Sequence, residues 1–391
     1  MCRLVQRRGI IGLFCLLFVA SSVVPGWAQK DNRFEVSKNL DIFNSLLKEV
    51  EMFYVDSVDV DKTVQRGIEA MLAGLDPYTE YYPEQKTEEL SLMTTGEYGG
   101  IGSLIRQRNN EGGVMIAEPT EGMPADLAGL KPGDLILAID TIDVSKATNS
   151  RVSELLKGVP NTKMVLTIQR PGEKKPRKFE ITRKQITTPQ VTYYGVKNDS
   201  IGYIYLKAFT IKSAQEVKEA FLDLKKNHNI KSLVLALRGN GGGVLEGAVQ
   251  IVGMFVPKGS EVLSTKGKIK QWDRTYRTST EPLDTVMPLA ILINGGTASA
   301  AEIVSGSLQD MDRAVLVGQR SFGKGLVQAP RDLPYNGKVK ITMSKYYIPS
   351  GRCIQQIDYS HRKEDGSVAA IPDSLTSVFY TSKKRPVRDG G

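Results

Sequence analysis

Three apolar runs that each lead into a glycine-rich loop constrain the fold of this chain more than any other feature. The runs lie at 233–237, 289–293 and 314–317, and the loops that follow them are 238–243, 294–299 and 319–325. Amphipathic stretches separate them, which is the rhythm of strand and helix in a parallel α/β sheet. Ligands of such sheets bind just outside the carboxyl ends of the strands. We therefore expect an α/β core with its functional site among these three loops.

The stretches before this core follow two other patterns. Apolar residues recur at intervals of three and four from Phe34 to Pro83, which predicts a pair of helices. From 96 to 187, short apolar runs between glycine and proline turns predict a β-rich domain. The predicted division of the chain is a leader at 1–28, a helical segment at 29–95, a β-rich domain at 96–187 and the core at 188–391.

The first 28 residues have the composition of a cleaved export signal. Three arginines precede an apolar run at 10–24, and Gly26-Trp27-Ala28 offers a small-x-small cleavage site. The run is shorter than the roughly 20 residues that a membrane-spanning helix needs. We therefore expect a signal peptide and an exported protein, which is periplasmic or associated with the cell envelope if its source is bacterial.

Composition limits the class of partner. Removal of the signal peptide takes away three arginines and no acidic residue, so the net charge falls from +9 to +6. This mild excess favours proximity to an acidic surface such as a membrane, whereas no basic block interleaved with aromatic residues indicates a nucleic-acid partner. No Cys and His cluster with metal-ligand spacing occurs either, so we expect no metal and no cofactor.

The catalytic candidates of the predicted loops are a serine and a lysine. The chain has two histidines, His228 in a Lys- and Asn-rich helix end and His361 in a charged loop, and neither has the setting of a catalytic base. A serine hydrolase built from this chain would therefore use lysine as its base, a known variant of the Ser-His-Asp arrangement.

Each candidate also has a purely structural interpretation. Ser299 and Glu302 form the pattern of a helix-capping box, but a helix start also presents free backbone N–H groups that can stabilise an oxyanion. Lys324 can equally be a solvated residue of a glycine turn. An exposed lysine is protonated near neutral pH, whereas burial beside Phe322 and Leu326 would lower its pKa and make it a base.

The stretch 318–325 is also a near match to a phosphate-binding loop. The position that should be Ser or Thr, to hold Mg²⁺, is Gly325. The residues at 326–330 are strand-like where a helix is required. We therefore reject nucleotide binding.

Taken together, these segments resemble the C-terminal processing peptidases, also called tail-specific proteases. The likeness covers nearly the whole chain after the signal peptide, and the 96–187 stretch resembles the PDZ domain that this family carries. The matching stretches are 98–102, 237–243, 294–310, 313–318, 322–328 and 346–352. The resemblance implies an α+β multidomain protein: an α/β serine protease core of the crotonase or Clp-protease type, an inserted β-rich PDZ domain and an N-terminal helical segment.

Carried over residue by residue, the resemblance implies a catalytic set. Ser299 matches the nucleophile, Lys324 the general base and Gln328 the residue that orients the lysine. Gly242 and the backbone N–H of Ala300 match the oxyanion hole.

In the PDZ domain, the resemblance implies a site for the C-terminal carboxylate of a substrate. The carboxylate is expected to bind the backbone N–H groups of Gly100, Ile101 and Gly102. The side chains expected to line the adjoining apolar pocket are those of Val152, Leu155 and Leu156.

These expectations describe an exported serine endopeptidase whose partners are proteins or peptides bound by their C-termini. The alternative is a catalytically inactive PDZ scaffold that holds the tails of exported proteins. The sequence leaves open whether the chain forms a homo-oligomer.

Overall fold

The computed structural model describes residues 32–108 and 112–391, so the predicted signal peptide at 1–28 lies outside the described part. Two compact units divide the chain after Ile68. In the part that the structure describes, no helix is both long enough and apolar enough to cross a membrane.

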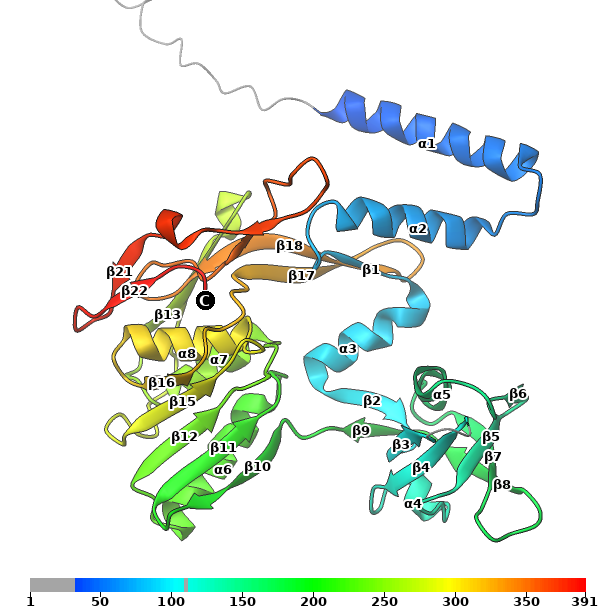
Figure 1. Ribbon diagram of the computed structural model, residues 1–391, viewed down its shortest axis with the longest axis horizontal. Coiled ribbons are helices and arrows are strands. Elements are labelled where there is room, and N and C mark those ends of the chain that lie inside the picture. Colours follow the sequence, from blue (N-terminus) through cyan, green and yellow to red (C-terminus); the bar gives the residue numbers. More distant parts are fainter. Residues whose placement is uncertain (1–31, 109–111) are drawn as a thin grey trace, which may run out of the picture. The chain divides into compact units, whose positions relative to one another are not determined.

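Two helices begin the described chain, as the three-and-four periodicity predicted. α1 spans Arg33–Phe53 and α2 spans Val60–Ala73 (Figure 1). None of the residues of α1 is fully buried. The next elements are β1 (Glu80–Tyr82), the 3₁₀ turn η1 (Glu84–Lys86) and α3 (Thr87–Thr95).

The α/β core is built on a five-stranded sheet in the order β10-β11-β12-β15-β16 (Figure 1). Four strands run parallel, and β10 pairs antiparallel with β11 at one edge. The three apolar runs of the sequence are β12, β15 and β16, so their carboxyl ends lie at one edge of the sheet, as predicted. The strand bounds are β10 Val191–Lys197, β11 Ile201–Leu206, β12 Ser232–Ala236, β15 Leu289–Ile293 and β16 Val315–Gly318.

Three helices connect the strands of this sheet: α6 (Ser213–Asn227), α7 (Leu245–Gly253) and α8 (Ala300–Asp310). α6 is amphipathic, and its side chains Phe221 and Leu224 are fully buried in the cluster that contains the strand residues. Burial of each such side chain stabilises the fold by about 1.5–3 kcal/mol. α8 is buried along nearly all of its length, so the helix that follows Ser299 has a fixed position.

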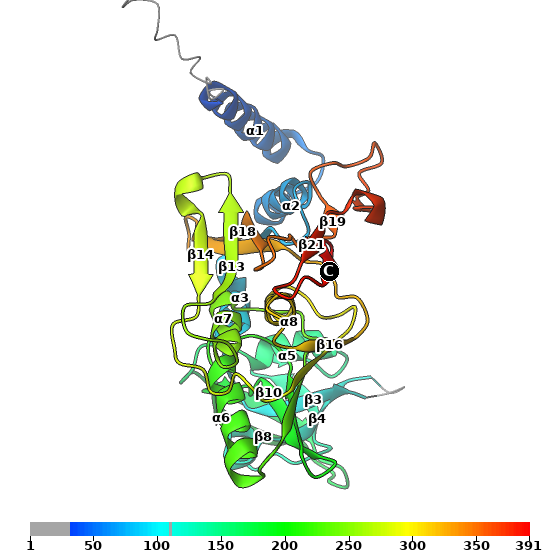
Figure 2. The ribbon, with the colours of Figure 1, turned by 90° about the vertical axis from the view of Figure 1, so that its left-hand side faces the viewer.

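A second, antiparallel sheet of the core was largely missed by the sequence patterns. β18 (Lys338–Tyr347) pairs with β1, with β13 (Glu261–Gly267) and with β17 (Leu326–Asp332). β14 (Arg274–Arg277) completes the sheet beside β13 (Figure 2). β17 directly follows the loop 319–325 that contains Lys324, so the prediction of a strand at 326–330 is confirmed.

The PDZ region contains a sheet in the order β3-β4-β5-β7-β8, with β6 beside β5. β2 pairs antiparallel with β9, which brings the two ends of the predicted 96–187 segment together. Its own core includes Ile116, Ile136 and Leu166, all fully buried. The element bounds are β2 Glu97–Gly100, β3 Ser103–Gln107, β4 Val114–Pro119, α4 Pro124–Leu127, β5 Leu135–Ile139, β6 Ile142–Asp143, α5 Asn149–Leu156, β7 Lys163–Gln169, β8 Arg177–Thr182 and β9 Lys184–Thr187.

The remaining elements are short and lie mostly toward the C-terminus. β19 pairs with β20, and β21 pairs with β22 in a hairpin. The bounds are η2 Lys270–Trp272, β19 Ile357–Asp358, β20 Ala369–Ala370, η3 Asp373–Leu375, β21 Val378–Tyr380 and β22 Pro386–Arg388.

Candidate active site

Ser299 lies at a sharp bend between strand β15 and helix α8. Its backbone has φ 56° and ψ −118°, a positive φ that side-chain-bearing residues rarely adopt. Such strain costs about 1–3 kcal/mol and persists only where the surroundings enforce it, which is common at functional sites. The strand, bend and helix thus present Ser299 as a nucleophile elbow does. The predicted capping box is formed as well, because Glu302 accepts a hydrogen bond from the Ser299 backbone N–H at 2.7 Å.

Glu302 binds the lysine loop as well as the serine loop. Its Oε2 atom accepts from the backbone N–H groups of Ser299 at 2.7 Å and of Lys324 at 3.0 Å. Its Oε1 atom accepts from the Gly323 N–H at 2.7 Å and from the Ser321 hydroxyl at 2.6 Å. The side chain is 2% exposed, and burial raises the pKa of its carboxyl group while the four hydrogen bonds oppose that rise. One buried carboxylate therefore holds the two candidate catalytic loops together.

Tyr346 of strand β18 makes a second connection between the same loops. Its hydroxyl lies 2.6 Å from the Lys324 carbonyl oxygen and 3.1 Å from the Ser299 carbonyl oxygen. A hydroxyl has one proton, so the shorter contact to Lys324 is the donated hydrogen bond. The ring is 1% exposed, and burial raises the pKa of the phenol well above its usual value, which keeps it a donor.

The Lys324 side chain is largely removed from water. Its Nζ atom lies 4.2 Å from the centre of the Tyr78 ring. Burial lowers the pKa of Lys324, and the positive charge of Lys340 lowers it further, while Asp76, Glu80 and Glu302 oppose the shift. The expected burial is therefore present and favours the neutral amine, although Phe322, one of the two neighbours expected to supply it, is 41% exposed.

Gln328 is directed toward strand β18. Its Nε2 atom donates to the Thr342 hydroxyl at 3.0 Å. Among the described residues, we find no hydrogen bond from Lys324 Nζ to either Gln328 or Ser299 Oγ. The structure therefore brings the three predicted residues into adjacent loops and strands without joining their side chains.

The two predicted oxyanion donors differ in whether their backbone N–H groups already have an acceptor. Ala300 N–H, at the first turn of α8, has no acceptor among the described residues, as is usual at a helix start. The Gly242 N–H instead donates to Asn240 Oδ1 at 2.9 Å. A Cβ atom at Gly242, whose φ is 93°, would lie 2.7 Å from Ser299 Cβ and 2.8 Å from Ala300 N. Only glycine leaves this space open beside the serine.

Asn240 was not a candidate from the sequence. It is fully buried, and it connects the glycine loop to the serine loop because its carbonyl oxygen accepts from Ala298 N–H at 2.9 Å. Its Nδ2 atom donates to the Leu206 carbonyl at 2.9 Å. These bonds fix the loop on the sheet, and the side-chain oxygen remains the acceptor for Gly242.

The predicted carboxylate loop of the PDZ domain has free donors. The carbonyl oxygens of Ile101 and Gly102 accept from Ala125 N–H and Thr120 N–H, whereas their own N–H groups have no acceptor among the described residues. A cavity of about 50 Å³ adjoins this loop. It is lined by Tyr98, Gly100, Ile101, Gly102, Ser103, Ile105, Ser153, Leu156 and Lys157.

The side-chain pocket of the PDZ domain differs from the expectation. Leu156 lines the cavity, but Val152 is fully buried in the domain core and Leu155 packs against that core. The reason is helical geometry, since the positions of α5 that face the cavity also include Ser153 and Lys157, which the apolar pattern could not reveal. Lys157 Nζ lies 5.5 Å from the centre of the Tyr98 ring, so a positive charge borders the carboxylate loop.

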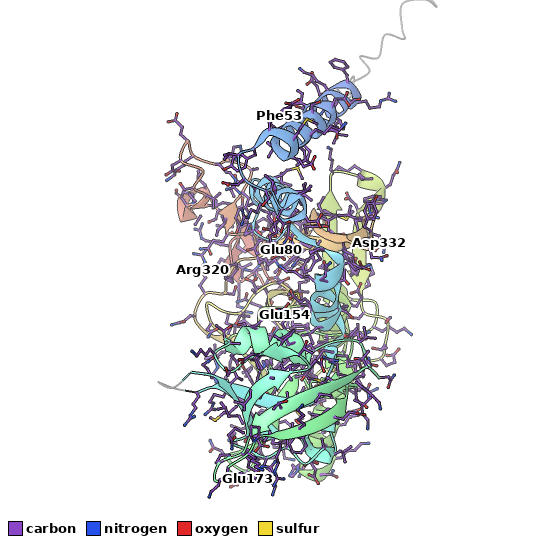
Figure 3. The ribbon with its side chains drawn as sticks, turned by 90° about the vertical axis from the view of Figure 1, so that its right-hand side faces the viewer. Phe53, Glu80, Glu154, Glu173, Arg320 and Asp332 are labelled. Carbon is purple, nitrogen blue, oxygen red and sulfur yellow. The ribbon has the colours of Figure 1, made fainter. Side chains whose placement is uncertain are left out.

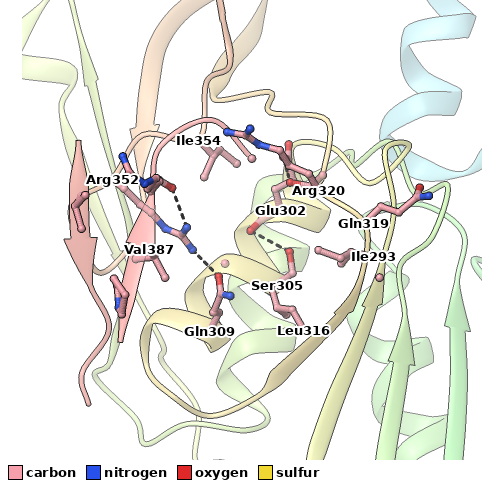
Figure 4. A pocket seen from close by; sticks show the side chains of 17 residues that line it. Ile293, Glu302, Ser305, Gln309, Leu316, Gln319, Arg320, Arg352, Ile354 and Val387 are labelled. Atoms are coloured by element: carbon pink, nitrogen blue, oxygen red, sulfur yellow. Dashed lines mark hydrogen bonds between the residues drawn. The ribbon is translucent and has the colours of Figure 1, made fainter. Parts of the chain in front are cut away.

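A larger cavity of about 630 Å³ lies along α8, between β16 and the C-terminal hairpin (Figure 4). Glu302 faces it, and Arg352 crosses it to bind Gln309 at 2.8 Å and the Arg388 carbonyl at 3.0 Å. Arg352 also pairs with the buried Asp310 at 3.0 Å. These contacts anchor the C-terminal strands to α8.

Comparisons with known proteins agree with these features. Residues 200–360 match the model of peptidase family S41, and residues 115–170 match that of the PDZ domain. A carboxy-terminal-processing protease of Bartonella bacilliformis is 36% identical over 356 residues, which cover 90% of this chain and 81% of that protein. A probable CtpA-like serine protease of Staphylococcus aureus is 32% identical over 320 residues, which cover 81% of this chain and 62% of that protein.

A solved structure is also similar to this chain. It is a photosystem II D1 C-terminal processing protease with 28% sequence identity and a TM-score of 0.45, and the match covers 80% of this chain and 89% of that chain. The identity to the Bartonella protein, over most of both sequences, decides the family. The chain therefore belongs to peptidase family S41, the carboxy-terminal-processing serine proteases, and carries a PDZ domain.

Proposed function

We propose that this protease is exported and cleaves proteins whose C-terminal ends its PDZ domain binds, with Ser299 as nucleophile and Lys324 as general base. The observation that carries the proposal is the buried carboxylate of Glu302, which binds the backbones of both residues. The test is cleavage of an unfolded protein by the wild type and by Ser299→Ala. We also propose that the domains follow the predicted boundaries, with the signal peptide at 1–28.

In the proposed reaction, the neutral amine of Lys324 takes the hydroxyl proton of Ser299 while the serine oxygen attacks the scissile carbonyl carbon. The oxyanion accepts a hydrogen bond from Ala300 N–H. Gly242, the predicted second donor, can take this part only if its N–H leaves Asn240 Oδ1, to which it donates at 2.9 Å. The C–N bond then breaks, and the Lys324 ammonium gives its proton to the leaving amine. Water, deprotonated by Lys324, hydrolyses the acyl ester and restores the serine hydroxyl.

The pH dependence of cleavage should report the lysine. Because only the neutral amine is a base, kcat/KM should rise with pH and level off above the lowered pKa of Lys324. Lys340→Met removes a positive charge that lowers this pKa and leaves Glu80, its partner, to act on Lys324 alone. The midpoint of the pH profile should therefore move to higher pH.

Lys338→Met is the matched control for Lys340→Met. Lys338 lies two residues earlier on β18 and pairs with Asp332 at 2.5 Å. Loss of the Lys338 charge should leave the midpoint of the pH profile of kcat/KM unchanged. A midpoint that stays fixed or falls in Lys340→Met would contradict the assignment of the titration to Lys324.

Recognition of the substrate should begin at its C-terminus. The free N–H groups of Ile101 and Gly102 can bind a carboxylate, and Lys157 adds a positive charge nearby. A peptide with an amidated C-terminus loses this negative charge. Hydrogen bonds to a charged group contribute about 1.5–3 kcal/mol, so kcat/KM for the amidated peptide should be roughly tenfold to a hundredfold lower.

The comparison needs one peptide with a free and an amidated end, assayed on the wild type at sub-saturating concentration. Gly102→Val is the companion variant, because φ is 67° at this position and a Cβ would lie 2.4 Å from that of Met123. It should reduce cleavage of the free peptide more than that of the amidated one. Equal rates for the two peptides on the wild type would mean that the PDZ domain does not select chain ends.

A further inference from the structure

A turn at residues 76–79, which no step of the proposed reaction uses, touches the candidate base directly. Its aromatic residue, Tyr78, places its ring 4.2 Å from Lys324 Nζ. The same ring packs edge-on against Tyr359, with ring centres 5.8 Å apart and the two hydroxyl oxygens at 3.3 Å. The ring thus contacts both a residue of the C-terminal region and the lysine.

The turn itself is rigid. The Asp76 carboxylate is 7% exposed, and its Oδ1 atom accepts from the backbone N–H groups of Tyr78 and Thr79, both at 2.8 Å. Its Oδ2 atom accepts from the Thr79 hydroxyl at 3.1 Å. A side chain that closes its own turn in this way fixes the direction of the residue between, here the ring of Tyr78.

The same turn reaches Gln328 through a pair of threonines. Thr79 Oγ1 lies 3.3 Å from Thr342 Oγ1 and accepts from the Thr342 backbone N–H at 3.2 Å. Thr342 Oγ1 in turn accepts from Gln328 Nε2. The amide nitrogen of Gln328 thus donates to Thr342. The amide oxygen is the atom with which Gln328 can accept a hydrogen bond from another group.

We propose that the 76–79 turn positions the catalytic base: Tyr78 holds the Lys324 ammonium on its ring face, and Thr79 orients the Gln328 amide through Thr342. Tyr78 and Thr79 are then positioning residues, which act through Lys324 and Gln328 without touching the scissile bond. The inference rests on the proposed function, in which Lys324 is the base.

The charges around Lys324 agree with this role. Lys340 on β18 faces it as a like charge, and Asp76, Glu80 and Glu302 face it as opposite charges; Glu80, labelled in Figure 3, lies on β1 just after the turn. Burial raises the pKa of Tyr78, so its ring remains a neutral phenol. A neutral aromatic face attracts the ammonium form of a lysine and also keeps water from the neutral form.

The first test compares Tyr78→Leu with Tyr78→Phe. Leucine keeps an apolar cover but removes the attraction for the ammonium, so Nζ loses its fixed place. We expect kcat to fall about tenfold or more with KM within about twofold, while Tyr78→Phe stays within about twofold of the wild type. The titration midpoint of Lys324 should fall by about half a pH unit or more in Tyr78→Leu.

The midpoint is measured without turnover. Each Tyr78 variant is combined with Ser299→Ala, treated with an amine-specific acylating reagent across a pH series, and the modification of Lys324 is quantified by mass spectrometry. Tyr193→Leu is the matched control, because Lys197 Nζ lies 5.1 Å from the centre of the Tyr193 ring in a similar contact. Both residues lie on β10, at the opposite edge of the sheet from β16. Tyr193→Leu should change neither kcat nor the Lys324 midpoint.

A second variant tests the other half of the proposal. Thr79→Val keeps the shape but removes the hydroxyl between Asp76 and Thr342, so kcat should fall several-fold at constant KM, and Thr79→Ser should restore it. Thermal melting identifies any variant that fails to fold. If the variant of one of the two residues, Tyr78 or Thr79, does not fold, the variant of the other residue decides the inference.

The outcomes separate the two proposals. If Tyr78→Leu is folded and matches Tyr193→Leu in kcat and in the Lys324 midpoint, the inference is overturned even where Ser299 and Lys324 prove essential. If Lys324→Ala cleaves peptides as fast as the wild type, the proposed function is overturned, and the positioning role falls with it.

Discussion

Ser299→Ala and Lys324→Ala are each expected to lower kcat/KM for peptide cleavage by at least about a thousandfold while the protein stays folded. Alanine at 299 leaves no nucleophile, and alanine at 324 leaves no base to take the serine proton. The bonds that join the two loops run to backbone groups, since Glu302 binds the backbones of both residues and Tyr346 binds that of Lys324; the Ser299 side chain adds only its part of the capping box. The melting temperatures should therefore change little.

The double variant distinguishes a catalytic unit from two structural residues. Groups that act in one step are strongly non-additive, so Ser299→Ala with Lys324→Ala should be hardly slower than either single variant. Ser305→Ala is the control on the same helix, because its hydroxyl donates only to carbonyls of α8, at 2.9 Å to Ala301. Partial losses that add in the double variant, or full activity of Ser299→Ala, would refute the Ser/Lys assignment. Absence of cleavage by the wild type itself would favour the inactive-scaffold alternative.

Glu302→Leu is expected to abolish most activity and to destabilise the fold as well. The substitution leaves the N–H groups of Ser299, Gly323 and Lys324 and the Ser321 hydroxyl without their buried acceptor. A buried donor without a partner costs about 1–3 kcal/mol, so with four such donors the free energy of unfolding should fall by at least about 4 kcal/mol. Cleavage should fall by about a hundredfold or more, because the lysine loop is no longer tied to the serine loop.

Glu302→Gln should not behave as a conservative change. Each carboxylate oxygen accepts from two donors, so either orientation of the amide places its NH₂ group against at least one backbone N–H; of the four donors only the Ser321 hydroxyl can turn to accept. Its loss of stability should be smaller than that of Glu302→Leu, but its activity should still fall clearly. Chemical denaturation and kcat/KM, measured on the same samples, separate the two effects.

Glu216→Gln is the matched control for this carboxylate. Glu216 of α6 accepts from the backbone N–H groups of Gln190 and Val191, at 2.6 and 2.8 Å, on an edge strand of the core. Both bonds go to Oε2, and the amide oxygen of Gln can take its place, so stability should fall only slightly and kcat/KM should not change. A Glu302→Gln protein with normal activity would show that the carboxylate does not position the two loops.

Much of the core was predictable because its signals are local. An apolar run of four or five residues followed by a glycine-rich loop specifies a buried strand and its end, and β12, β15 and β16 follow those runs closely. The strands of the second sheet had no such signal. Most positions of β18 are partly buried, with no alternation to mark a strand. β18 pairs with three different strands, which no window of the sequence contains.

Side-chain direction limited the prediction of the PDZ pocket. The resemblance implied Val152 as a pocket residue, and the structure places its side chain in the core of the domain. Ser153 and Lys157 line the cavity instead, and polar residues on an amphipathic helix look the same from sequence whether they face water or a binding site.

The sequence by itself determined the order of the elements in the α/β core, the family resemblance and the choice of Ser299 and Lys324 as catalytic candidates, because each depends on residues adjacent in the chain. Only the tertiary structure decided how these two residues are held. Glu302 reaches 22 residues along the chain to Lys324, Tyr346 binds the same loop from β18, and Tyr78 covers the lysine from before the PDZ domain. Burial, and with it the lowered pKa of Lys324, is created by segments that meet only in the folded chain, so no local pattern could have specified it.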